Sequence, residues 1–108
     1  MPAAPNMTED ELQRCVIDCA KLFGWLVHHT RPARSAKGWR TPVQGDAGFP
    51  DLVLVRAGRV LFVELKSARG SVRPNQVRWR DALPDERYRL WRPADWQNGT
   101  IESELRNL

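Results

Sequence analysis

The sequence has no hydrophobic run that could cross a membrane, because nothing in it approaches roughly 18 consecutive apolar residues. Its first residues also lack the charged start and apolar core of a secretion signal. These absences predict a cytoplasmic protein with no membrane partner. With 108 residues, the chain is long enough for one hydrophobic core but not for two, so we expect one domain.

Cysteine is scarce as well. The chain has only Cys15 and Cys19, which lie four positions apart in a segment with helical periodicity. Together with His28 and His29 they could outline a zinc site, but their spacing matches no standard zinc finger. We therefore expect both thiols to be buried and structural.

Acidic residues are absent from two long basic segments. The first, residues 20–45, contains Lys21, Arg31, Arg34, Lys37 and Arg40. The second, residues 65–80, contains Lys66, Arg69, Arg73, Arg78 and Arg80. The net charge is +4 and the isoelectric point is about 9.7. This segregation is typical of a nucleic-acid-binding surface, although solvated surface charge on a basic protein gives the same pattern.

Two apolar runs, residues 52–55 and 60–63, flank a short segment that contains Ala57 and Gly58. Glycine adopts a positive φ at little cost, so this pattern predicts a β-hairpin. If Ala57 and Gly58 form a two-residue loop, directly opposed residue numbers sum to 115. An odd-length loop without a bulge would shift one strand by one residue and move its side chains to the other face.

The two-residue register brings three charged side chains together. It places Asp51 across from Glu64, and Lys66 projects from the same face as Glu64 because side chains alternate along a strand. Charges beside an apolar core are costly unless they are compensated. A salt bridge to Lys66 is one interpretation. The other is a Mg²⁺ or Mn²⁺ site, since these ions bind oxygen ligands and often use only one or two carboxylates.

A helix is predicted to begin after Thr8, because residues 8–11 have the pattern of a capping box between Thr8 and Glu11. An apolar stripe follows, and Gly24 is expected to end the helix. The stripe consists of Leu12, Val16, Cys19 and Phe23. Glu11 is occupied by the cap, whereas Glu9 lies nearer the buried face. We therefore favour Glu9 over Glu11 as an active-site acid, although Glu9 could also simply favour the helix dipole.

The remaining pattern predicts the element order α-β-β-β-α-β-α, a mixed sheet flanked by helices. Residues 1–7 are expected to be a flexible lead-in, and residues 8–108 the folded domain. The later elements are strands at 25–30 and 87–91 and helices at 74–83 and 101–108. Residues 31–47 are predicted to be a long connection that either grips DNA or is a flexible insert without a role.

Short motifs follow one another along the chain. They are Thr8-Glu9 with Gln13, Gly24-Trp25, residues 48–52, Glu64-Leu65-Lys66, Gly70, and Gln76 followed by Trp79. Pro50-Asp51, followed after an apolar strand by Glu64-Leu65-Lys66, resembles the PD-(D/E)xK nuclease superfamily. The set as a whole resembles its VRR-NUC family and covers nearly the whole chain. Arg73 departs from the family pattern, which often has a Thr or Ser helix cap at that position.

The resemblance implies a restriction-endonuclease-like core and metal-dependent hydrolysis of DNA that leaves 5′-phosphate ends. The residues assigned to catalysis are Glu9, Asp51, Glu64, Lys66 and Gln76. Asp51 and Glu64 would bind Mg²⁺ or Mn²⁺, with the backbone carbonyl of Leu65 as a further ligand. Lys66 would position or activate water, and Glu9 and Gln76 would orient that water or a phosphate.

Stand-alone family members of this size resemble structure-specific nucleases. We therefore expect a homodimer that acts on branched DNA, either Holliday junctions or flaps. The expected DNA-binding residues are Arg31, Arg34, Lys37, Trp39, Arg40, Arg69 and Arg73. Two alternatives stay open: a non-catalytic DNA-binding or nuclease-partner module with this fold, and a nuclease for RNA or single strands.

Overall fold

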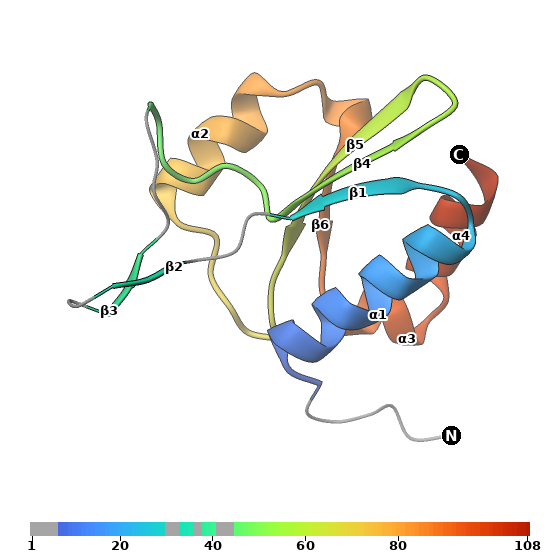
Figure 1. Ribbon diagram of the computed structural model, residues 1–108, viewed down its shortest axis with the longest axis horizontal. Helices are drawn as coiled ribbons and strands as arrows, with labels where there is room; N and C mark the ends of the chain where they lie inside the picture. Colours follow the sequence, from blue (N-terminus) through green and yellow to red (C-terminus); the bar gives the residue numbers. More distant parts are fainter. Residues whose placement is uncertain (1–6, 30–32, 36–37, 41–44) are drawn as a thin grey trace.

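A computed structural model shows a four-stranded mixed sheet with helices on both of its faces (Figure 1). It describes residues 7–29, 33–35, 38–40 and 45–108. The strands, in their order across the sheet, are β1 (Leu26–His29), β4 (Leu52–Arg56), β5 (Arg59–Leu65) and β6 (Tyr88–Trp91). β4 pairs antiparallel with β1 and β5, and β6 pairs parallel with β5. The predicted fold class is therefore confirmed.

Three helices cover one face of the sheet and one helix lies on the other (Figure 1). On the first face are α1 (Glu9–Leu22), α3 (Pro93–Gln97) and α4 (Thr100–Asn107). Helix α2 (Pro74–Ala82) lies on the second face, and a 3-10 turn (Asp85–Arg87) leads from it into β6. The sequence predicts one C-terminal helix, whereas the structure has two, separated by Gly99 with a φ of 85°.

The hydrophobic core lies between the sheet and the layer of α1, α3 and α4. Leu52 and Leu54 of β4 and the alternate residues of β5 point into it, as the period of two along a strand requires. The buried members are Leu12, Val16, Cys19, Ala20, Trp25, Leu52, Leu54, Leu61, Val63, Leu65, Trp91, Ile101 and Leu105. Each fully buried leucine contributes about 1.5–3 kcal/mol. Cys19 is buried as predicted, but Cys15 is only partly buried.

The β4–β5 hairpin has the predicted register. Its pairs run from Leu52 opposite Val63 to Arg56 opposite Arg59. Ala57 and Gly58 have φ values of 49° and 81°, which is the positive-φ pair of a type I′ turn. This geometry carries Asp51 to the end of the hairpin where Glu64 lies.

The N-terminal end of α1 also agrees with the sequence. The Glu11 amide donates to Thr8 Oγ1 at 3.1 Å, and the Thr8 amide donates to Glu11 Oε1 at 3.0 Å. Met7, which the sequence analysis includes in the lead-in, is partly buried and packs against the core. An apolar residue just before the N-cap commonly packs against the fourth helical residue, which here is Leu12. Residues 1–6 lie outside the described residues.

The long connection between β1 and β4 contains a second sheet that the sequence analysis did not predict. Strands β2 (Ala33–Ser35) and β3 (Gly38–Arg40) pair antiparallel, with Ala33 opposite Arg40. Three-residue strands are too short to show a clear alternation. Of the predicted DNA-binding residues, Arg34, Trp39 and Arg40 lie in these strands, whereas Arg31 and Lys37 lie outside the described residues.

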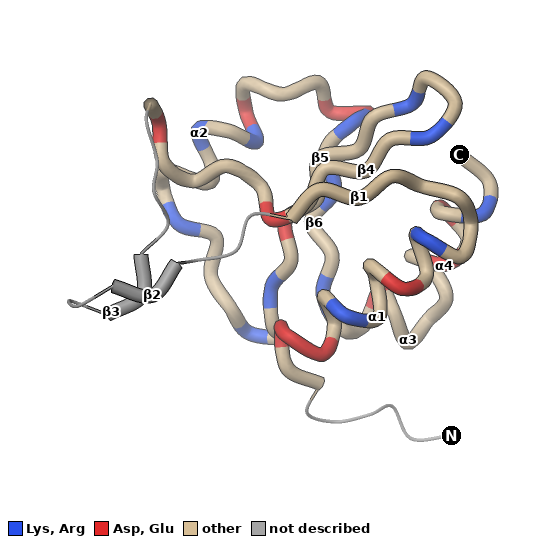
Figure 2. The backbone as a smooth tube through the Cα atoms, viewed as in Figure 1, with Lys and Arg blue, Asp and Glu red and all other residues tan. Residues whose placement is uncertain are grey.

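Charged residues are distributed unevenly over the fold. Figure 2 shows basic positions along the segment that joins β5 to α2, beside the acidic positions at the start of α1. Within the described part of the chain, no helix is both long and apolar enough to span a membrane.

Candidate active site

Asp51 and Glu64 meet at the open end of the β4–β5 hairpin, as the register predicts. Asp51 precedes β4, and its Oδ2 accepts a hydrogen bond from the Leu65 amide at 2.8 Å. Glu64 lies in β5 and is only 1% exposed. Because Glu64 alternates with the core residues Val63 and Leu65, its carboxyl group lies on the face of the sheet that carries α2.

The surroundings of Glu64 strongly favour its neutral form. Burial raises its pKa to about 8, and the charge of Asp51 and a hydrogen bond with it act in the same direction. Lys66 opposes this shift, with Nζ 3.7 Å from Glu64 Oε2. The ion pair considered from the sequence is therefore present, but one ammonium group faces two carboxylates. When both carboxyl groups are ionised, their negative charge exceeds the charge of Lys66, and this excess favours an additional cation.

Glu9 lies at the rim of the same site. Burial raises its pKa and so does the charge of Asp51, whereas Lys66 and Arg73 lower it. Glu11 is exposed, as Glu9 is, but the hydrogen bonds with Thr8 lower its pKa. The geometry therefore supports Glu9 rather than Glu11 as the acid that faces the site.

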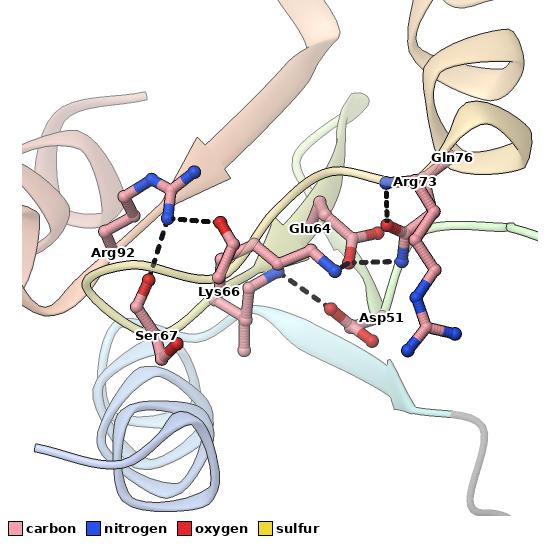
Figure 3. A network of polar contacts seen from close by, with 9 residues as sticks. Asp51, Glu64, Lys66, Ser67, Arg73, Gln76 and Arg92 are labelled. Carbon is pink, nitrogen blue, oxygen red and sulfur yellow. Dashed lines mark hydrogen bonds and ion pairs between the residues drawn. The ribbon is translucent and has the colours of Figure 1, made fainter.

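Gln76, in the first turn of α2, uses its amide to hold another side chain. Its Nε2 donates to Glu64 Oε2 at 3.1 Å, and its Oε1 accepts from the Arg73 amide at 2.9 Å (Figure 3). The sequence analysis expects this amide to orient water or phosphate. In the structure both ends of the amide are hydrogen-bonded, so that Gln76 ties the Glu64 carboxyl group to the start of α2. That it also orients water or phosphate stays a prediction.

The segment before Asp51 packs closely against α2. Gly48 has a φ of 97°, and a Cβ atom there would lie 2.6 Å from the Asn75 carbonyl carbon and oxygen. No side chain fits at this contact. The backbone of α2 therefore approaches the segment before Asp51 directly at Gly48.

Trp79 holds the same segment from the next turn of α2. Its Nε1 lies 3.1 Å from the Ala47 carbonyl oxygen and 3.3 Å from that of Asp46. Phe49 makes edge-to-face contacts with Trp79 at 4.9 Å and with Phe62 of β5 at 6.0 Å. The sequence has Trp79 in one motif with Gln76, but nothing in it indicates these partners.

The basic residues near the site differ in their partners. Arg78 lies 4.0 Å from Asp46, and Arg80 lies 3.2 Å from Asp81. Among the described residues, no acid lies within ion-pair distance of Arg69 or Arg73. These two exposed arginines, which flank the site in sequence, are therefore available to an anionic ligand.

The oxygen donors of the site fit a small divalent cation. Among the described residues, no group of three His, Cys, Asp or Glu side chains lies close enough together to hold a metal ion. Asp51 and Glu64 supply two carboxylates, and Mg²⁺ commonly binds one or two of these together with water and substrate phosphate. The donor set therefore suits Mg²⁺ or Mn²⁺. The Leu65 carbonyl as a further ligand stays a prediction.

The comparisons with known proteins bear on the identity of this site. Residues 11–91 match the VRR-NUC domain, a family of nucleases. No curated protein and no solved structure gives a significant match. The matched range runs from α1 to β6 and includes Asp51, Glu64, Lys66 and Gln76, whereas Glu9 lies just before it. Because this match spans most of the chain, the protein belongs to the VRR-NUC nuclease family.

Proposed function

We propose that this protein is a Mg²⁺- or Mn²⁺-dependent endonuclease that hydrolyses DNA phosphodiester bonds. The observation that carries the proposal is the juxtaposition of Asp51, buried Glu64 and Lys66 at one end of the hairpin. In a nuclease family, a pair of carboxylates with more negative charge than Lys66 neutralises is best explained as a metal centre.

Each residue of the site has a different role in the proposed hydrolysis. A bound metal would stabilise charge on the scissile phosphate and lower the pKa of a water molecule. Asp51 and Glu64 would hold the metal, and Gln76 donates a hydrogen bond that orients the Glu64 carboxyl group. The Lys66 ammonium offsets negative charge and positions the attacking water. Glu9, at the rim, orients that water.

The substrate we propose is branched DNA, either a Holliday junction or a flap, bound by a homodimer. Arg69 and Arg73 supply contacts to phosphates on one side of the site. The β2–β3 hairpin supplies a second basic element through Arg34 and Arg40. Phe49 is 40% exposed and lies two residues before Asp51, where its free surface offers a stacking contact to an unpaired base.

A cleavage assay tests this function. Wild-type protein, Asp51→Asn and Glu64→Gln are incubated with duplex, flap, four-way-junction and single-stranded DNA and with RNA, in Mg²⁺, Mn²⁺ or EDTA. We expect the wild type to cut junctions or flaps faster than the other substrates. It should cut only when Mg²⁺ or Mn²⁺ is present. Both variants should lose cleavage by orders of magnitude while keeping the fold. Binding without cleavage by the wild type would instead indicate a non-catalytic module, and preferred cutting of RNA or single strands would contradict the substrate.

A further inference from the structure

Arg92 lies just after β6 and reaches back to the segment that follows Lys66. Its guanidinium Nη1 donates to the carbonyl oxygens of Ser67 and Gly70, each at 2.8 Å (Figure 3). Hydrogen bonds from a charged donor are stronger than those between neutral groups. Arg92 therefore joins two ends of one turn, residues 67–70, to the edge of the sheet.

Among the described residues, few other hydrogen bonds hold this turn. The Gly70 amide donates to the Ser67 carbonyl at 3.3 Å, which is a long hydrogen bond, and Ala68 and Arg69 between them are exposed. The Lys66 amide donates to the Trp91 carbonyl at 3.1 Å and so continues the pairing of β5 with β6 up to the turn. Beyond that point, Arg92 is the main connection between the turn and the sheet.

The turn covers the side chain of Lys66. A Cβ atom built on Gly70 would lie 3.5 Å from Lys66 Cδ, which is ordinary van der Waals contact, and 3.0 Å from Ser67 Oγ. Lys66 is only 8% exposed, although its side chain is long and flexible. The turn therefore borders the alkyl chain of Lys66, whose ammonium group lies 3.7 Å from Glu64 Oε2.

We infer that Arg92 is a positioning residue for Lys66: it clamps the turn at residues 67–70 over the lysine side chain and so keeps the ammonium group at the carboxylates. The inference rests on the proposed function in that the Lys66 ammonium matters for hydrolysis. The backbone amide of Arg92 caps α3 by donating to Asp95 Oδ2 at 2.8 Å, and a side-chain substitution leaves that bond in place. Replacing Arg92 therefore removes the clamp selectively.

Arg89 provides a matched control. It also lies in the β6 region, is partly buried, and donates to the backbone carbonyls of Glu86 and Tyr88 as well as to Glu104. None of these partners belongs to the turn over Lys66. Loss of Arg89 should therefore reproduce a general loss of stability without releasing Lys66.

The first experiment measures the accessibility of Lys66 without any metal or substrate. The chain has three lysines, Lys21, Lys37 and Lys66, so acetylation by an active ester can be followed at each by mass spectrometry. Arg92→Ala should increase the acetylation rate of Lys66 relative to exposed Lys21 by roughly threefold or more, because the turn opens locally. Arg89→Ala should leave the ratio unchanged. An unchanged ratio in Arg92→Ala, or an equal rise in Arg89→Ala, would overturn the inference.

The second experiment asks whether the clamp matters for hydrolysis. Arg92→Ala should lower kcat by on the order of tenfold to a hundredfold with KM nearly unchanged, because a displaced catalytic group costs rate rather than binding. Arg92→Lys, which keeps a cationic donor, and added guanidinium ion should each restore part of the rate. A wild-type kcat in Arg92→Ala would contradict the inference. Absence of cleavage by the wild type would contradict the proposed function and leave the acetylation result to decide the clamp.

Discussion

At the scale of single residues, Glu64 shows how the site opposes the stability of the fold. It is 1% exposed and lies against Asp51, so its ionisation in the folded protein keeps two negative charges close together and away from water. Its pKa is accordingly about 8 rather than 4.5. A bound cation would remove this cost, which is why the arrangement is easier to explain as a binding site than as a structural element.

This shift has a consequence for stability that can be measured. Below pH 4.5 Glu64 is protonated in both the folded and the unfolded chain, whereas between about 4.5 and 8 only the unfolded chain releases the proton. The free energy of unfolding in EDTA should therefore fall as pH rises through this window. Urea denaturation at several pH values should show a smaller fall for Glu64→Gln than for the wild type. Parallel curves for the two proteins would refute the assignment.

The two acids at the start of α1 should behave differently. Glu11→Ala removes one half of the capping box and should lower the free energy of unfolding by about 1 kcal/mol or less, with cleavage largely kept. Glu9→Ala should reduce kcat with little change in stability, because Glu9 faces Asp51 and Lys66 rather than the cap. Thermal denaturation and cleavage rates measure the two effects, and the reverse pattern would show that the acids are assigned wrongly.

At the scale of secondary-structure elements, the β4–β5 turn determines whether Asp51 and Glu64 meet. Ala57 has a φ of 49°, which disfavours most residues with a Cβ atom but suits asparagine. Ala57→Asn should therefore raise the free energy of unfolding by about 0.5–1 kcal/mol, and Ala57→Val should lower it. Denaturation curves give the free energy of unfolding of each variant. If both variants were more stable than the wild type, or both less stable, the turn assignment would be contradicted.

The β2–β3 hairpin and the segment after β5 are the two elements that we propose to bind DNA. Charge reversal at Arg34 and Lys37 in an Asp51→Asn background should weaken binding to every sequence, because phosphate contacts do not read bases. Each lost contact to duplex phosphate should reduce the slope of log affinity against log salt by about 0.9. Fluorescence anisotropy at several salt concentrations measures this slope. If it does not move, the DNA surface lies around Arg69 and Arg73, and reversal there should reduce the slope instead.

The sequence predicted some elements well because their signals are local. The two apolar runs and Gly58 predicted the hairpin and, for a two-residue loop, its register, and the spacing of Thr8 and Glu11 predicted the start of α1. Helix α3 has only five residues, too few to show a repeating helical pattern, so the sequence analysis missed it. The hydrogen bonds of Arg92 and Trp79 join residues far apart in the chain, and no local sequence pattern predicts them.

At the scale of the whole molecule, the hydrophobic core and the carboxyl group of Glu64 lie on opposite faces of the sheet. The core lies beneath α1, α3 and α4, whereas Glu64 projects from the other face toward α2. The site draws Glu9 from α1, two carboxylates from the β4–β5 hairpin and Gln76 from α2. Substitutions within the site should thus change chemistry more than folding, which makes the variants of Asp51 and Glu64 informative.

Calorimetric titration with Mn²⁺ in the absence of DNA tests the central claim, that Asp51 and Glu64 form a metal centre, most directly. The wild type should bind Mn²⁺ with an affinity that increases with pH up to about 8, because binding displaces the proton of Glu64. Asp51→Asn and Glu64→Gln should show no saturable binding under the same conditions, whereas Glu11→Ala should bind like the wild type. Equal Mn²⁺ affinity in the wild type and in both carboxylate variants would contradict the account.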